Sequence, residues 1–195
     1  AWGARVGCVS VVGSDYPAEA LAALRARGVA LDGVRALSAP GLRVWLLHED
    51  GVRHMVSRLG RPTHEAVSPT PEDVPEAWRE ASWVHVAPMP FARQRAMVEV
   101  CGGGARFVAV DPHMPLRRDT LDAWRPVLAE ADALFASDDE LHLDGAPREV
   151  LRTLAVGRMR YVVHKQGARG GTLYDARDDA LWRWQPVPAR VTRTE

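Results

Sequence analysis

Hydrophobic positions along the chain fall into short continuous runs that alternate with segments of helical spacing. The first run, residues 5–12, is apolar and β-branched, which predicts a strand buried on both faces. Pro17 then opens a predicted helix, and Gly28 ends it. After residue 82 the same rhythm returns. The predicted strands there are 83–87, 107–111, 133–136 and 161–165, and the predicted helices are 91–101, the segment through Leu121, Trp124 and Leu128, and the one after Pro147.

This alternation predicts an α/β fold on a mainly parallel, doubly wound sheet, with right-handed crossovers placing helices on both faces. Ligands of such sheets bind beyond the carboxyl ends of the strands. The polar groups at those ends are Asp15, Asp111, Ser137 with Glu140, and Lys165 with its glycines. Carboxylates, a hydroxyl and a lysine at one edge favour a site for a metal-bound phosphate ester.

A different pattern separates the first helix from the later block. Two apolar segments flank Asp50-Gly51, a strong signal for a two-residue hairpin turn. Both faces of this ribbon carry apolar side chains, which a solvated ribbon does not need. We interpret it as a lid or an interface; an edge ribbon packed on its own domain is the alternative. The expected cross-strand pairs are Leu46 with Met55, His48 with Arg53, Trp45 with Val56 and Leu47 with His54.

A polar connector follows the hairpin and leads back to the parallel block. Thr70 is expected to cap a helix that begins at Pro71. The apolar positions of this predicted helix lie on one face at helical spacing. They are Val74, Ala77, Trp78 and Ala81.

The last predicted strand runs into a glycine-rich turn. Glycines at 167, 170 and 171 can present bare N–H groups, and a row of such groups forms a concave site for anions. Lys165, the only lysine of the chain, directly precedes this turn. The alternative is an ordinary hairpin turn into the next strand, 172–174, because short glycine patterns are weak signals.

Composition and charge exclude several classes of protein. The 195 residues suit a single domain, and 25 basic against 25 acidic residues give no net field that would attract nucleic acid. No apolar run is long enough to predict a membrane span. Cys8 and Cys101 lie in apolar stretches without disulfide or zinc spacing, which favours a cytoplasmic location.

Taken together, these segments resemble the ribokinase-like (PfkB) family of carbohydrate kinases. Val-Gly-x-Asp ends the first strand at Asp15, and a hairpin resembles the family's sugar-covering clasp. Asp111-Pro112 resembles its Asp-Pro-Asn strand end, and Glu140 its Asn-x-x-Glu segment. The resemblance covers nearly the whole chain. It implies one partial ribokinase-like domain over 1–195, with 38–60 as the β-hairpin lid.

The resemblance also implies ATP and Mg²⁺ as cofactors, with phosphoryl transfer to a hydroxyl of a sugar or sugar-like small molecule. The catalytic base and anion hole of the family's Gly-Ala-Gly-Asp motif are expected after Glu195, and its Gly-Gly segment before Ala1. A homodimer through the hairpin lid is expected. The implied roles are nucleotide binding by Lys165, Gly167 and Gly170, substrate binding by Asp15, Trp45, Arg53 and Asp111, and metal binding by Glu140 and Ser137.

Departures from the family pattern keep other readings open. Ser137 replaces the Asn of Asn-x-x-Glu, while His113 and Pro115 replace the family's Asn and Arg. They favour a catalytically degenerate protein that binds a ligand or partner. A dinucleotide-binding oxidoreductase is the third reading, weakened because no Gly-x-Gly-x-x-Gly follows the first strand.

Several candidate residues also have an ordinary structural explanation. A carboxylate at Glu140 suits a helix N-terminus, Lys165 suits a solvated strand end, and Asp111 suits a turn. Packing explains Trp45 as well as a sugar contact does. His85, His113 and His164 show no metal-ligand spacing and are interpreted as structural.

Overall fold

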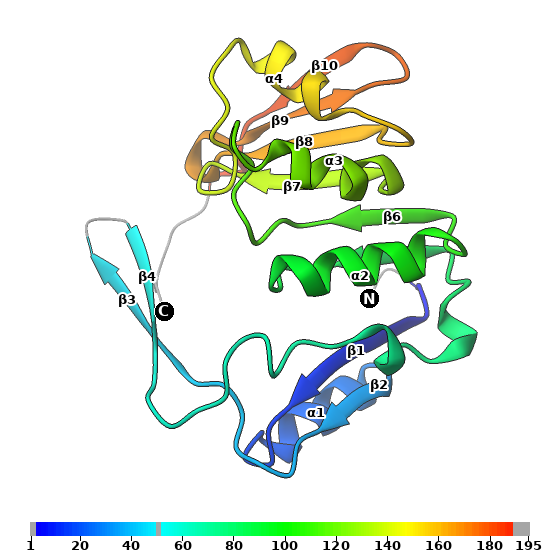
Figure 1. Cartoon of the computed structure of the whole chain (residues 1–195), viewed down its shortest axis with the longest axis vertical. Coiled ribbons are helices and arrows are strands. Elements are labelled where there is room, and N and C mark those ends of the chain that lie inside the picture. The colour runs from blue at the N-terminus through cyan, green and yellow to red at the C-terminus, as the bar shows by residue number, and fades with distance from the viewer. Residues whose placement is uncertain (1–2, 50–51, 189–195) are drawn as a thin grey trace.

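A six-stranded sheet forms the main body of the computed structural model, which describes residues 3–49 and 52–188 (Figure 1). Its strands lie in the order β10-β9-β8-β7-β6-β5. β5 to β8 are parallel, and β9 and β10 run antiparallel to their neighbours. The predicted mainly parallel α/β fold is confirmed. The strands are β5 (Trp83–Val86), β6 (Phe107–Val110), β7 (Ala133–Ser137), β8 (Tyr161–Lys165), β9 (Gly171–Asp175) and β10 (Ala180–Trp184).

Three helices cover one face of this sheet: α2 (Phe91–Gly102), α3 (Leu121–Glu130) and α4 (Pro147–Leu154) (Figure 1). They share one core with the sheet, in which Trp124 and Val98 are fully buried. β5 to β8 are adjacent in chain order, so successive right-handed crossovers bring each helix to the same face. The second helical layer expected from the sequence is not found among the described residues. The opposite face carries Trp83, Phe107 and Tyr161 in a row of neighbouring rings.

A separate parallel pair, β1 (Val6–Val12) and β2 (Val29–Ala36), is joined by α1 (Ala18–Ala26). Gly28, with φ of +82°, ends this unit's helix as predicted. β2 was not expected from the sequence. The prediction that β1 is buried on both faces is wrong, because only Val11 of this strand is buried. β1 and β2 form a separate two-stranded sheet and are not part of the six-stranded sheet that α2, α3 and α4 cover.

The hairpin consists of β3 (Val44–Glu49) and β4 (Val52–Ser57). Its register contains all four predicted cross-strand pairs, from Trp45 opposite Val56 to His48 opposite Arg53. Asp50 and Gly51, the predicted turn, lie outside the described residues. The ribbon stands apart from the six-stranded sheet (Figure 1).

The connector after the hairpin contains two short 3₁₀ turns, η1 (Pro71–Asp73) and η2 (Glu76–Trp78), where the sequence predicted one α-helix. Pro75 lies between them, and its missing N–H and fixed φ interrupt an α-helical hydrogen-bond pattern. Thr70 occupies the N-cap position as predicted, but of η1, and its backbone N–H donates to Asp73 Oδ2 over 2.9 Å.

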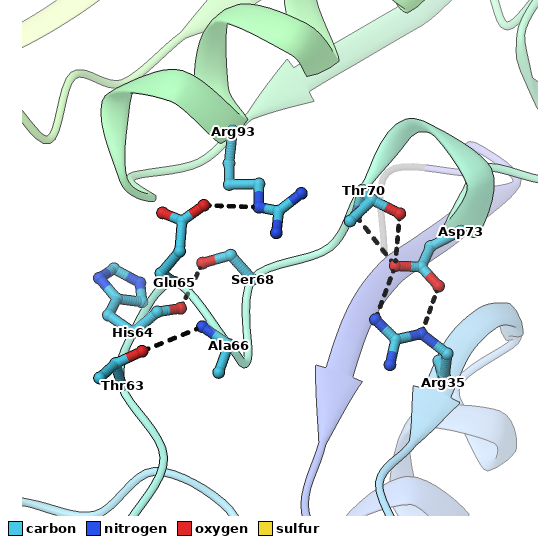
Figure 2. Close-up of polar contacts among 9 residues, drawn as sticks. All are labelled: Arg35, Thr63, His64, Glu65, Ala66, Ser68, Thr70, Asp73 and Arg93. Atoms are coloured by element: carbon cyan, nitrogen blue, oxygen red, sulfur yellow. Dashed lines mark hydrogen bonds and ion pairs between the residues drawn. The ribbon is translucent and has the colours of Figure 1, made fainter.

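Ion pairs tie this connector to both neighbouring units (Figure 2). Asp73 accepts two hydrogen bonds from Arg35 of β2, with Nε 2.6 Å and Nη2 3.1 Å away. Glu65 lies 2.8 Å from Nε of Arg93 on α2. The connector is therefore held by α2 through Glu65 and by β2 through Asp73.

A guanidinium–carboxylate pair at the amino end of the sheet joins loops that are far apart in sequence. Arg158 donates to both carboxylate oxygens of Asp132, at 3.1 and 2.7 Å, and to the Gly102 carbonyl at 3.0 Å. The Val108 N–H donates to the same Asp132 carboxylate at 2.7 Å. This network fixes the start of β6 against the segment before β8.

Cys8 and Cys101 are both free, and burial raises the pKa of the Cys101 thiol. None of the helices within 3–49 and 52–188 combines the length and apolar composition that crossing a bilayer requires.

Candidate functional site

The carboxyl ends of β6, β7 and β8 meet at one edge of the sheet and bring several predicted residues together. Lys165 Nζ lies 2.8 Å from Asp111 Oδ1, so this ion pair reaches from the end of β8 to the end of β6. Ser137, the register partner of Lys165, ends β7 between them. Both charged side chains remain partly exposed, 39% for Lys165 and 23% for Asp111. A cation and a carboxylate are thus presented to solvent at the predicted edge.

Glu140 lies in the turn that follows β7. Its Oε2 accepts a hydrogen bond of 2.6 Å from the Ser137 N–H, and its backbone carbonyl accepts one of 2.7 Å from Leu116. The carboxylate therefore closes its own turn, with a second oxygen left for other partners. Within the ranges that the structure describes, no three His, Cys, Asp or Glu side chains gather as a metal site. Glu140 and Ser137 are adjacent, as the sequence predicted, but they do not form a complete set of metal ligands.

The glycine-rich turn after β8 has the backbone that its glycines predict. Gly167 and Gly170 adopt φ of +54° and +86°. The N–H groups of Gln166, Arg169 and Gly170 bond to carbonyls of the same turn. In this described segment the N–H groups of Gly167 and Ala168 have no protein acceptor. Two backbone donors, fewer than the glycine pattern suggested, are left for an anion.

A pocket of about 410 Å³ adjoins this turn, between α4 and the ends of β8, β9 and β10. None of Lys165, Gly167 and Gly170 lines it, but their neighbours Gln166 and Arg169 do. Lys165 extends toward Asp111, and because successive side chains of a strand alternate between faces, its neighbour His164 lines the pocket instead. The other lining side chains include Leu141, Leu143, Val150, Leu151, His164, Arg183 and Trp184.

Asp15 follows β1 and lies in a cluster of its own. Its Oδ1 accepts the Gly41 N–H at 2.7 Å, and its Oδ2 accepts from Arg43 at 3.0 Å and from Arg61 at 2.9 Å. The Gly41 hydrogen bond, with the two guanidinium groups, holds the pKa of Asp15 below its usual value, while burial opposes the shift. Asp15 is thus already bound by three donors, and none of them comes from the Asp111–Lys165 edge.

Trp45 and Arg53, the other predicted substrate residues, lie on the hairpin. Trp45 is 58% exposed, and the Arg58 guanidinium stands 5.4 Å from the centre of its ring. Arg53 belongs to β4, opposite His48. The structure places both residues on the lid.

Three residues near this edge were missed or treated as ordinary in the sequence. The fully buried Gln94 of α2 donates to the carbonyls of Ala87 and Asp111, at 3.1 and 2.7 Å, and so fixes the ends of β5 and β6. His64 meets His113 edge to face, with ring centroids 5.0 Å apart. Burial lowers the pKa of His64, and His113 lowers it further. A polar residue on the apolar face of α2 was the available signal for Gln94; nothing in sequence spacing pairs the histidines.

The fold of the chain is similar to that of several kinases of known structure. No family model matches the chain. Ribokinase II from E. coli, solved with ATP and Mg²⁺, superposes with a TM-score of 0.70 over 96% of this chain, at 19% identity. The chain has the ribokinase-like fold. The resemblance seen in the sequence is therefore confirmed for the fold, which the nucleoside kinase of Burkholderia thailandensis, solved with inosine, also shares (TM-score 0.67, 97% of the chain, 16% identity).

A curated relative is the cytidine kinase of Thermococcus kodakarensis, 26% identical over 180 residues that make up 89% of this chain. The chain spans less than two thirds of each of these three proteins: 62% of the cytidine kinase, 64% of the E. coli protein and 60% of the Burkholderia protein. The Asp111–Lys165 edge and the hairpin therefore belong to the portion of the ribokinase-like fold that this chain covers.

Proposed function

We propose that the protein containing this chain transfers a phosphoryl group from ATP to a hydroxyl of a sugar or sugar-like small molecule, the sugar being free or part of a nucleoside. The observation that carries the proposal is the Lys165–Asp111 pair, which stands beside Ser137 and a glycine turn with two unused N–H donors. Phosphoryl transfer depends chiefly on positioning and charge stabilisation, for which such groups are suited. ATP, Mg²⁺ and inosine bound to proteins of the same fold support it.

On the nucleotide side, we assign the phosphates to Lys165 and to the backbone of the turn at Gly167 and Gly170. Glu140 and Ser137 fit a Mg²⁺ ion that is held mainly by phosphate oxygens and water, because Mg²⁺ sites commonly use one or two carboxylates. The free carboxylate oxygen of Glu140 would hold a metal-bound water. When bound, the ion would neutralise negative charge on the phosphates.

On the acceptor side, we assign Asp111 at the sheet edge and Trp45 with Arg53 on the lid. We also assign Asp15 to the acceptor side, because it holds the base of the lid. We propose that the chain is one partial domain over 1–195 with 38–60 as the lid, and that it works in the cytoplasm. No catalytic base is assigned to any residue of the chain. We expect the base in a Gly-Ala-Gly-Asp segment after Glu195.

The direct test is a measurement of ADP release by the full-length gene product with Mg²⁺ and a panel of sugars and nucleosides. Release that depends on one acceptor, with a phosphorylated product found by mass spectrometry, is the expected result. Full-length protein that binds Mg²⁺-ATP but phosphorylates no member of the panel would contradict the enzymatic proposal.

Lys165→Met should weaken the binding of Mg²⁺-ATP about tenfold, because a charge-assisted hydrogen bond to phosphate contributes about 1.5–3 kcal/mol and part of this is offset by releasing Asp111. The Kd is measured by titration calorimetry on the full-length protein. Arg106→Met, at an exposed position just before β6 and so at the opposite end of that strand, is the matched control and should leave the Kd unchanged. Equal affinity of the Lys165→Met variant and the parent would remove Lys165 from the nucleotide site.

A homodimer through the hairpin lid is also proposed, because both faces of the ribbon expose apolar side chains. Trp45 and Met55 are 58% and 60% exposed, and Val56 is 47% exposed. Trp45→Asp combined with Val56→Asp should therefore shift the protein from dimer to monomer in sedimentation velocity. Trp182→Asp, at another exposed tryptophan, should not. Unchanged sedimentation of the lid variant would contradict pairing through the hairpin.

A further inference from the structure

The orientation of the hairpin lid depends on its base. β3 and β4 pair only with each other among the described strands. Side chains on both faces are about half exposed, 58% for Trp45 and 52% for Leu46 and Leu47. The body of the ribbon is thus not packed against the rest of the described chain. Whatever sets its direction must act where the chain enters and leaves it.

The segment that leads into β3 (the entering leg) and the segment that follows β4 (the leaving leg) both bind the carboxylate of Asp15. Asp15 accepts the backbone N–H of Gly41 and a guanidinium N–H of Arg43 on the entering leg, at 2.7 and 3.0 Å. It also accepts a guanidinium N–H of Arg61 on the leaving leg, at 2.9 Å. The Arg58 N–H donates to the Arg43 carbonyl at 3.0 Å, so Arg43 stands at the last rung of the hairpin. Asp15 itself follows β1 and belongs to neither leg.

The entering leg crosses the end of β1 at very close range. The Ser14 N–H donates to the Ala39 carbonyl at 3.0 Å, and a Cβ at Gly13 would overlap the backbone of Gly41. Glycine at both positions lets the two backbones touch. Asp15 is therefore anchored at a rigid crossing, from which its carboxylate reaches the second leg at Arg61.

We propose that Asp15 is a positioning residue that sets the direction of the lid by holding both of its legs against the end of β1. A single exposed ion pair contributes little, but here one carboxylate is shared by a backbone amide and two guanidinium groups from different segments. Without this carboxylate, Arg61 on the leaving leg loses its contact with the end of β1. The consequence for acceptor binding rests on the function proposed above; the mechanical role does not.

Spin labels on the lid and the main body test this role without any ligand. The labels replace Met55 on β4 and Asp122 on α3, both exposed, in a background with Cys8→Ser and Cys101→Ala. Double electron–electron resonance should give one narrow distance distribution for the parent. Asp15→Asn, which keeps the shape of the side chain but not its charge, should broaden that distribution about twofold, because the base of the lid loses its ties.

Asp73→Asn is the matched control, because it breaks another carboxylate–guanidinium pair, with Arg35, in η1 of the connector (Figure 2). Its distribution should stay narrow. If Asp15→Asn fails to fold, the double variant Arg43→Gln with Arg61→Gln removes the same ties from the lid side. A narrow distribution in whichever of these variants folds would overturn the proposal.

In the full-length enzyme, Asp15→Asn should raise the KM of the acceptor about tenfold, because small misplacements of a positioning element are costly. The Kd of Mg²⁺-ATP should not change. A loss that falls equally on acceptor and nucleotide would indicate general destabilisation and overturn the positioning role. Absence of any kinase activity would overturn the proposed function alone, since the label distances do not depend on it.

Discussion

Gly170→Ala should lower the free energy of unfolding by several kcal/mol. Gly170 has φ of +86° and ψ of −123°, a region that only glycine adopts without strain, and such strain costs about 1–3 kcal/mol. A Cβ there would also overlap the Trp184 carbonyl, which belongs to β10. Relieving that overlap requires the end of β10 to move, and forced overpacking costs about 1–3 kcal/mol more. Urea unfolding followed by circular dichroism measures the difference.

Gly167→Ala is the matched control within the same turn. Its φ is +54°, but nothing lies within 4 Å of the position of the added Cβ. The strain alone should cost about 1–2 kcal/mol. A loss from Gly170→Ala no larger than that from Gly167→Ala would contradict the close contact with β10. The control is informative for nucleotide binding as well, because its methyl group stands in open space beside two unused N–H donors.

Asp132→Ala should destabilise the fold by about 1–3 kcal/mol, the usual cost of leaving buried donors without an acceptor. The variant leaves the Arg158 guanidinium and the Val108 N–H without the acceptor they share. The side chains are 16% exposed for Asp132 and 32% exposed for Arg158, so water replaces these bonds only in part. Thermal and urea unfolding of the variant and the parent measure the loss.

Asp122→Ala removes a carboxylate from an exposed place. Asp122 pairs with Arg125 at 3.2 Å, but its side chain is 96% exposed and that of Arg125 is 53% exposed. A loss below about 1 kcal/mol is expected for this control. Similar losses from Asp132→Ala and Asp122→Ala would show that burial does not strengthen the network at Arg158.

Local patterns in the sequence predict much of this fold. The hairpin register follows from its turn length and alternation, and all four predicted pairs are present. The parallel strands from Trp83 to Lys165 follow from apolar runs between helical segments. The convergence of Asp111, Ser137 and Lys165 follows from the rule that parallel strands end at one edge.

Features that depend on tertiary partners were not predictable in the same way. β2 contains Asp32, Gly33 and Arg35, so it lacks an apolar run, and it is a strand because β1 supplies its partner. Pro75 divides a segment whose apolar spacing is helical. The role of Asp15 depends on Arg43 and Arg61, which come close to it only once the lid has formed.

The Lys165–Asp111 pair has an entropic consequence for any anion that arrives at this edge. A free lysine side chain loses up to about 2 kcal/mol of rotamer freedom when a ligand fixes it. Asp111 already holds the ammonium group 2.8 Å away, so most of that loss is incurred during folding. An incoming phosphate therefore exchanges one counter-ion for another on a preordered cation and does not have to order a mobile side chain.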